Sequence, residues 1–328
     1  GAGVDSWRMV AGGWWLVVNG RRRAYSVELT GSLQGLSRTG SMPPSIQVLR
    51  PSAPGWPSAL NDLRSVPAQL YLLGRHELLT APNGLVAIVG TRNATAYGER
   101  VADRLGEAFA AAGVPVVSGL ARGIDAAAHR GALRARGRTI AVLGTGVDVP
   151  YPAGHRDLHA TIAAQGLVIA EQEPGSQAHP GSFPQRNRII AALARVVIVV
   201  EAPHKSGAMN TVEHALGLGR VVAAVPGPID SPQSAGTNWL LGTGSQVVAT
   251  VDDALSLMGV HASALPPTED LEPIEADVLA SVPSSGAYLD EVAGASRLPI
   301  RQAGVVLTAL ELKGRVWLGS DGRVSRRL

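Results

Sequence analysis

The amino-acid sequence predicts an α/β protein with a doubly wound, mostly parallel sheet and a small C-terminal winged-helix domain. Between residues 85 and 258, short apolar runs alternate with longer amphipathic ones, as expected for strands that alternate with helices. The short runs are apolar throughout rather than at every second residue, so helices should cover these strands on both faces. Beyond residue 273, three short helical patterns precede a hairpin pattern, which is the order of elements in a winged helix.

The elements of the sheet domain follow in order along residues 85–258. The strands are expected at LVAIVG, VPVVSG, TIAVLG, LVIAE, VVIVVEA, VVAAVPG and SQVVAT. Helices are expected between them at residues 97–112, 124–136, 156–165, 186–193 and 211–218. Almost every strand pattern ends in glycine or a carboxylate followed by a polar turn. Ligands of doubly wound sheets bind beyond the carboxyl ends of the strands, so the functional site is expected at that edge.

The flanking regions divide the rest of the chain. Residues 1–45 carry clustered tryptophans, RRR and many glycines without a sustained period, so they receive no assignment; disorder or an artificial extension would each fit. Residues 46–84 form an N-terminal lead-in to the core. Residues 259–273 contain the proline-bearing stretch VHASALPPTEDLEP, which loses the apolar period and is expected to be a linker.

The winged-helix domain is expected at residues 274–328. Its helices are expected at residues 274–281, 289–293 and 300–313. The stretch RVWLGSDGRVSRR predicts a hairpin that turns at Asp321 and Gly322. A winged helix binds duplex DNA or protein, and the sequence favours neither.

Composition narrows the classes of function. The chain of 328 residues has a formal net charge of +3 and a pI near 9.6, so any basic binding surface must be local. It contains no cysteine, which excludes disulfides, thiolate catalysis and cysteine-ligated metals and fits a reducing cytoplasm. No apolar run approaches the roughly 20 residues of a membrane helix, so a cytoplasmic protein without membrane contact is expected. The eight histidines show no metal-site spacing, and no metal or cofactor is expected.

Two glycine turns follow the first two strands of the core. In VAIVGTRNATAYG, Gly90 and Arg92 lead into a helix, whose N-terminus and backbone N–H groups suit an anion. In VVSGLARGIDAAAHRGAL, Gly119 and Arg122 repeat this arrangement. Either arginine could bind phosphate, although Arg92 could instead pair with a carboxylate at the sheet edge. In the second turn, Asp125 and His129 could be an acid–base pair, but a helix cap and a hydrogen-bonded histidine explain them better, because no nucleophile is near in sequence.

Two further stretches carry candidate binding residues. In FPQRNRIIAAL, Phe183 precedes Arg186, Asn187 and Arg188 at the expected start of a helix, where cations are slightly disfavoured without an anionic partner. That partner could be an internal carboxylate or a nucleic-acid phosphate. In EAPHKSGAMNTVEH, a second set consists of Lys205, Ser206 and Gly207. Small residues there allow close approach of a phosphate or base, whereas ordinary helix capping explains the following Thr211 and Glu213 equally well.

These motifs together resemble the bacterial DNA-processing protein A family, DprA or Smf. The resemblance rests on GTR at 90–92, SGLARGIDAAAH at 118–129, GTGVDVPYP at 144–152, FPQRNRIIAAL at 183–193, VVEAPHKSGAMNT at 199–211 and VPGPIDSPQSAGTNWL at 225–240, and it covers roughly residues 46–328. The family implies an extended Rossmann-like core that binds single-stranded DNA, forms homodimers and loads the RecA recombinase during natural transformation and recombination, without enzymatic activity.

The resemblance also implies roles for particular residues. The family's binding arginine falls on Arg92, its arginine–asparagine–arginine element on residues 186–188, and its aromatic position on Phe183. Family members often carry a lysine shortly before the phenylalanine, where this chain has HPGS at residues 179–182, so one phosphate contact is in question.

Two alternative functions compete with this interpretation. LOG-like nucleoside-monophosphate phosphoribohydrolases share the general architecture, and their PGGxGTxxE motif loosely resembles SGAMNTVEH, with Thr211 and Glu213 in register. The paired glycines of that motif are missing here. The second alternative is a regulator that binds duplex DNA through the winged helix. Its support is limited to the four cationic residues Arg297, Arg301, Lys313 and Arg315.

Overall fold

The computed structural model describes two continuous regions of the chain and the backbone of three short N-terminal strands. The described residues are 45–260 and 271–326, apart from residues 136, 180, 284, 285, 314, 320 and 321, together with strands β1 (Arg8–Val10), β2 (Gly13–Val18) and β3 (Arg21–Ala24). These three strands pair antiparallel within a separate unit, Gly1–Met42. The expectations of disorder or an artificial extension for residues 1–45 fall mostly outside the described residues.

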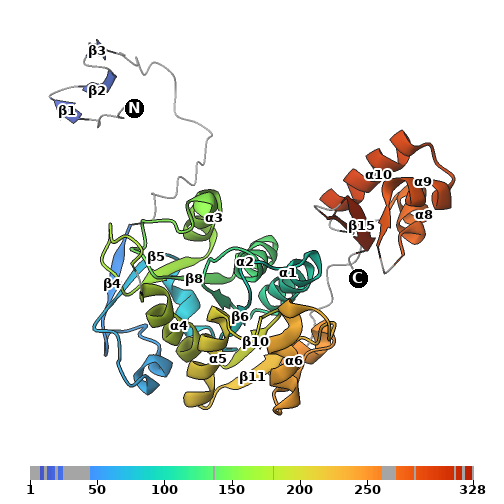
Figure 1. Cartoon of the computed structure of the whole chain (residues 1–328). Coiled ribbons are helices and arrows are strands. Elements are labelled where there is room, and N and C mark those ends of the chain that lie inside the picture. Colours follow the sequence, from blue (N-terminus) through green and yellow to red (C-terminus); the bar gives the residue numbers. More distant parts are fainter. Residues whose placement is uncertain are drawn as a thin grey trace. The chain divides into compact units, whose positions relative to one another are not determined.

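Within the described residues, nine strands form one sheet in the order β12-β11-β10-β6-β7-β8-β9-β5-β4. The strands are β4 (Gln47–Leu49), β5 (Leu70–Gly74), β6 (Val86–Val89), β7 (Val116–Ser118), β8 (Thr139–Leu143), β9 (Leu167–Ala170), β10 (Val196–Val199), β11 (Val221–Ala224) and β12 (Gln246–Val247). From β12 to β9 the pairing is parallel, which confirms the predicted doubly wound sheet (Figure 1). The lead-in adds β5 and β4 as antiparallel edge strands, which the sequence pattern did not reveal.

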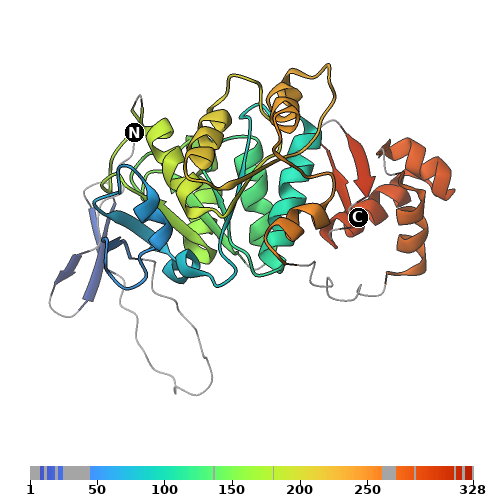
Figure 2. The ribbon, with the colours of Figure 1, turned by 90° about the horizontal axis from the view of Figure 1, so that it is seen from below.

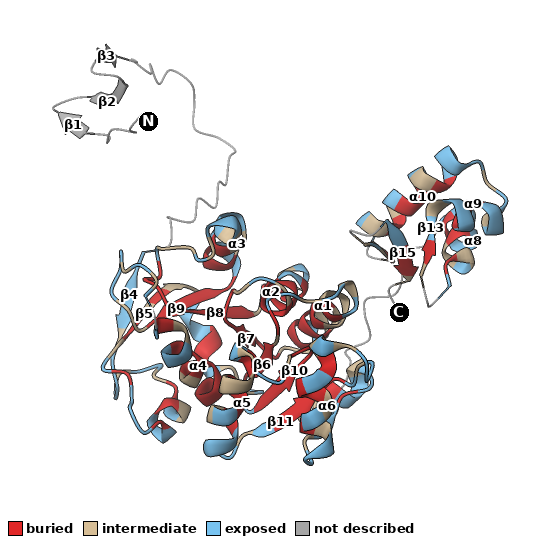
Figure 3. Ribbon diagram, in the orientation of Figure 1, coloured by how far each residue is buried: buried red, intermediate tan, exposed pale blue. Residues whose placement is uncertain are grey.

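Helices cover both faces of this sheet, as the continuous apolar strands required (Figure 2). The helices of the core are α1 (Ala96–Ala111), α2 (Ile124–Arg134), α3 (Arg156–Gln165), α4 (Ser182–Leu193), α5 (Gly207–Gly217), α6 (Ala235–Gly242) and α7 (Val251–Leu257). Alternate strand residues serve the two faces: Ile88 packs in a cluster with α1 and α2, whereas Val89 packs with α4 and α5. Figure 3 shows the strands buried between these layers.

Two of these helices begin earlier than the sequence predicted. Helix α4 begins at Ser182 rather than at Arg186, and it accommodates Pro184 because a missing N–H is tolerated in the first turn. Helix α5 begins at Gly207 rather than at Thr211. As a consequence, the arginines of residues 186–188 lie in the second turn of α4 and not at its mouth. Helices α6 and α7 were not expected.

The C-terminal region has the elements of a winged helix and its own apolar core, in which Val278, Val292 and Leu310 are buried. Its elements are α8 (Pro273–Ser281), β13 (Ala287–Tyr288), α9 (Leu289–Ser296), α10 (Ile300–Leu312), β14 (Val316–Leu318) and β15 (Arg323–Arg326). Strands β14 and β15 form the expected antiparallel hairpin, and β13 pairs with β15. The predicted helix bounds agree with these to within three residues.

Candidate functional site

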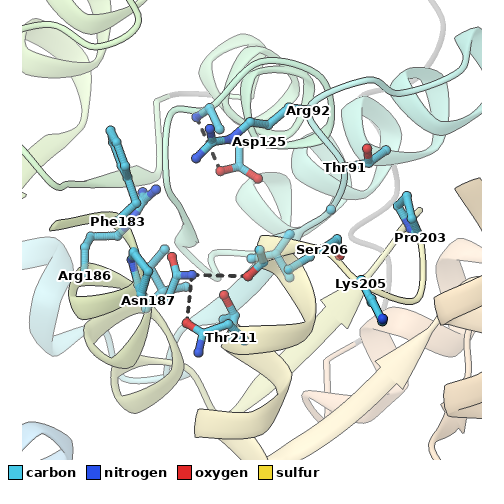
Figure 4. Close-up of a pocket in the computed structure, with 18 residues that line it drawn as sticks. Thr91, Arg92, Asp125, Phe183, Arg186, Asn187, Pro203, Lys205, Ser206 and Thr211 are labelled. Carbon is cyan, nitrogen blue, oxygen red and sulfur yellow. Dashed lines mark hydrogen bonds between the residues drawn. The ribbon is translucent and has the colours of Figure 1, made fainter. Parts of the chain in front are cut away.

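A cavity of about 510 Å³ lies beyond the carboxyl ends of β6 and β10, at the sheet edge where the sequence predicted a site (Figure 4). This volume falls in the range of about 300–1,000 Å³ that is typical of ligand pockets. The turn after β6, the turn after β7 and the first turns of α4 and α5 all contribute to its lining. The topology therefore brings together motifs that are more than 100 residues apart in the chain.

Arg92 and Phe183 meet at the rim of this cavity. The Arg92 guanidinium carbon lies 5.3 Å from the centre of the Phe183 ring, a cation–π contact. Arg92 is exposed and Phe183 is half-buried. Phe183 also contacts Tyr151, and the centres of the two rings are 4.9 Å apart. The rim thus offers a charged group and flat apolar surface side by side.

Arg186 lines the same cavity but is only 6% exposed. Its Nη1 donates a 2.6 Å hydrogen bond to the carbonyl oxygen of Val142. Burial lowers the pKa of Arg186 to about 10, with a further contribution from Arg92, while Asp125 opposes the shift. The side chain therefore stays protonated at neutral pH and places a positive charge beneath the cavity. Its Nε has no hydrogen-bond partner among the described residues.

Gly119 is needed for this placement of Arg186. A Cβ atom on Gly119 would collide with the guanidinium, which packs directly against the glycine. The backbone N–H of Gly119 donates to Asp125 at 3.1 Å, and that of Ala121 donates to the same oxygen at 3.4 Å. Gly119 thus gives Arg186 room and does not itself line the larger cavity.

Asp125 and His129 do not form an acid–base pair. Burial raises the pKa of Asp125, although Arg186 and the loop N–H groups oppose this shift. His129 is fully buried, and its Nδ1 lies 2.7 Å from the hydroxyl of Thr139. Burial, with Arg186 and other cations, lowers the pKa of His129 to about 3. A neutral histidine outside the cavity lining shapes the core and has no catalytic placement.

The N-terminus of α1 already holds an internal carboxylate. Glu201 is 3% exposed and accepts hydrogen bonds from the backbone N–H of Thr95 at 2.9 Å and from its hydroxyl at 2.5 Å. The expectation that the first glycine turn presents this helix N-terminus to an external anion is therefore wrong. Gly90 lines the cavity and also permits close packing, since a Cβ there would lie 2.5 Å from Ile124 and 2.7 Å from the Glu201 carbonyl oxygen.

The start of α5 is open to the cavity. Lys205 is exposed, and the N-cap residue Ser206 makes no side-chain capping bond, while its Oγ is buried without a partner among the described residues. Asn187 secures this turn from α4: its Nδ2 donates to the carbonyl oxygen of Gly207 and to the side chain of Asn210, both at 3.2 Å (Figure 4). Lys205, Ser206 and Gly207 all line the cavity, as the sequence led us to expect.

Arg188 does not line either this cavity or the smaller one beside it. Its Nη2 donates to both carboxylate oxygens of Glu171, at 2.7 and 2.6 Å, and its side chain is 11% exposed. The sequence offered Arg188 either a phosphate or an internal carboxylate as its partner, and the structure shows the internal carboxylate of Glu171. Arg188 points away from Arg186 because residues two apart on a helix do not share a face. Glu213, the residue that matched the enzyme motif, is exposed in the middle of α5 and does not line the cavity.

Sequence reasoning missed one aromatic residue of the site. Tyr151 lines a smaller cavity with Arg122, next to the first. Its position in the proline-bearing turn after β8, at the same sheet edge, was the available signal.

Comparison with known proteins agrees with this architecture. The family model described as DNA recombination-mediator protein A matches residues 47–259. The chain belongs to this family. A model of the DprA winged helix domain matches residues 262–318.

Among the relatives, a putative DNA processing protein DprA of Mycobacterium tuberculosis is 45% identical over 258 residues, covering 76% of this chain and 66% of the relative. The chain thus spans just under two thirds of that relative's length. Protein Smf of Synechocystis is 36% identical over 319 residues, covering 86% of this chain and 80% of the relative.

Two solved structures are similar to this chain. DprA of Streptococcus pneumoniae has a TM-score of 0.61 at 38% identity, covering 64% of this chain and 74% of that one. DprA of Helicobacter pylori has a TM-score of 0.60 at 32% identity, covering 66% of this chain and 97% of that one. Its structure is described as giving insight into its single-stranded DNA binding mode.

Across the part of the chain that the structure describes, helices are too short or too polar to traverse a bilayer. The same residues contain no group of histidine and carboxylate side chains that could hold a metal ion.

Proposed function

We propose that this chain binds single-stranded DNA in the cavity at the carboxyl edge of the sheet. The observation that carries the proposal is the rim formed by Arg92 over Phe183, with the buried charge of Arg186 beneath it. Single strands are bound by cationic grooves that track the phosphates and by aromatic rings on which bases stack. The description of the H. pylori relative as a single-stranded DNA binder supports the same assignment.

Each group has a distinct role in this proposal. Arg92 and Lys205 are exposed and bind phosphates, while Phe183 stacks against a base. Arg186 is buried and bonded internally to Val142, so it contributes positive potential, offset in part by Asp125, and makes no direct phosphate contact. Asn187 keeps the start of α5 in place, where the uncapped backbone N–H groups favour an anion. Recognition through phosphates and one ring gives little sequence preference.

The enzymatic alternative is less well supported. Acid–base catalysis on a bound nucleotide needs a proton-transferring side chain within hydrogen-bond reach of it. Asp125, the acidic residue of the cavity lining, is engaged by the N–H groups of Gly119 and Ala121, and Glu213 points to solvent outside the lining.

Duplex binding through the winged helix is also less well supported. The exposed residues of α10 are Ile300, Arg301, Gln302, Val305, Thr308 and Leu312; three of these six are apolar and one is cationic. A helix that enters the major groove needs several cationic or polar groups for phosphates and base edges.

From its family membership, we further propose that the chain acts in the cytoplasm as a homodimer. The dimer would load RecA onto single strands during transformation and recombination. A strand-exchange assay on DNA coated with single-strand-binding protein tests this step: the chain should relieve the inhibition of RecA. No relief, with intact DNA binding, would remove RecA loading from the proposal.

The primary test compares three ligands in one gel-shift series: single-stranded DNA, a duplex of the same sequence and a nucleoside monophosphate as competitor. We expect tight binding of the single strand, weaker binding of the duplex and no competition at low monophosphate concentration. Preference for the duplex would contradict the proposal, as would release of free base from the monophosphate.

A further inference from the structure

A second cavity adjoins the first and shares part of its lining. It has a volume of about 210 Å³ and is lined by Arg122, Tyr151 and Pro152 among others. Arg92 and Phe183 line both cavities. This cation–aromatic pair therefore forms the boundary between the two.

Tyr151 extends the flat surface of Phe183 into the second cavity. The two ring centres are 4.9 Å apart and their planes are inclined by 37°, so the rings are in contact and no base fits between them. Tyr151 is nevertheless 42% exposed, which leaves part of its ring free to contact a ligand. Arg122, at the same cavity, is exposed and can reach a phosphate.

The size of the second cavity indicates what it can hold. At about 210 Å³ it is smaller than the roughly 300–1,000 Å³ typical of independent ligand pockets, and it shares a wall with a larger one. A continuing polymer explains both facts: one nucleotide occupies the larger cavity, and only the base of its neighbour enters the smaller one.

We propose that Tyr151 and Arg122 form a second nucleotide subsite, in which the neighbouring base of a single strand stacks on Tyr151 while Arg122 binds the adjoining phosphate. Phe183 with Arg92 separates two successive bases. This inference rests on the proposed binding of single-stranded DNA and adds a residue, Tyr151, that makes the site hold two nucleotides instead of one.

The test compares thymidine monophosphate, the dinucleotide pTpT and a tetranucleotide as competitors of a labelled oligothymidylate. Wild-type protein should bind the dinucleotide more tightly than the mononucleotide. In Tyr151→Ala this gain should fall by roughly 5-fold to 150-fold, the range for one stacked base. Tyr151→Phe should keep it, because stacking needs the ring and not the hydroxyl. Tyr97→Ala is a matched control, since Tyr97 is 41% exposed and lines a different cavity.

The outcomes separate the inference from the proposed function. If wild-type protein binds no single strand, both fail. If it does bind, and Tyr151→Ala keeps the full gain or weakens mononucleotide and dinucleotide equally, the subsite is wrong and the proposed function stands. A measurement on wild-type protein avoids dependence on folding of the variant: 2-aminopurine as the second base of a dinucleotide should be quenched on binding, and unchanged fluorescence would overturn the subsite.

Discussion

Replacing Arg92 with alanine should weaken single-strand binding in a salt-dependent manner and leave the fold intact. Each phosphate contact contributes about 0.7 to the slope of log affinity against log salt for single strands, so the magnitude of the slope should fall by about 0.7. Over a tenfold rise in salt, the affinity difference between wild type and Arg92→Ala should then shrink about fivefold. The exposed contact with Phe183 contributes about 0.5–1 kcal/mol to stability, which corresponds to a melting temperature lower by about 1–4 °C.

Arg188→Ala is the matched control, because the structure places this arginine in an internal ion pair. Exposed ion pairs contribute about 0–1 kcal/mol, and breaking a fully buried one costs about 3–5 kcal/mol. The Arg188–Glu171 pair is 11% and 22% exposed, and we expect an intermediate loss of about 2 kcal/mol. The melting temperature should fall by about 4–8 °C, while the salt slope of DNA binding stays at the wild-type value.

Fluorescence anisotropy of a labelled oligothymidylate, from about 50 to about 500 mM salt, gives the slopes, and thermal melting gives the stabilities. Arg92→Ala with wild-type slope and affinity would refute the phosphate role of Arg92. Arg188→Ala with a normal melting temperature and a reduced slope would show that Arg188 faces the DNA and that the ion pair with Glu171 does not decide its role.

Three further predictions test other parts of the structure. Neither the wild type nor Glu213→Ala should release free base from a nucleoside monophosphate. Release by the wild type that disappears in the variant would show phosphoribohydrolase activity and contradict this prediction. Deleting residues 265–328 should preserve single-strand affinity, since that domain has a separate core; lost binding by a folded core would assign the primary site to the winged helix. His129 has a folded pKa near 3, below its usual 6.5, so its contribution to stability is present above pH 6.5 and is lost as the pH falls towards 3. The free energy of unfolding of the wild type should fall by about 1.4 kcal/mol per pH unit in this range because of His129. Between pH 6.5 and about pH 5, urea unfolding of His129→Gln should therefore show a loss about 2 kcal/mol smaller than that of the wild type. Equal losses would contradict the buried neutral state.

Much of the architecture could be predicted because the relevant forces are local to each segment. Strands β6 to β11 read as continuous apolar runs, and glycine turns follow two of them, so the sheet and its functional edge follow from period and composition. The strands β4 and β5 were not predicted, because both are short. Strand β5 pairs with β9, which is far away in sequence, and β4 pairs with β5 on one side only.

The side-chain details of the site depend on contacts that sequence spacing does not reveal. Glu201 reaches Thr95 across 106 positions and occupies a helix N-terminus that the local pattern offers to a phosphate. Arg186 and Arg188 lie two positions apart in α4, and this helical phase sends one beneath the cavity and the other to Glu171.

Photo-cross-linking locates the DNA most directly. An oligonucleotide that carries 5-iodouracil is irradiated in complex with the full chain, and the modified peptide is identified by mass spectrometry. Binding at the sheet edge predicts adducts at Phe183 or Tyr151, the two aromatic rings of the cavities. Adducts confined to α10 and the hairpin of the winged helix, with none on either ring, would contradict the assignment of the cavity as the single-stranded DNA site.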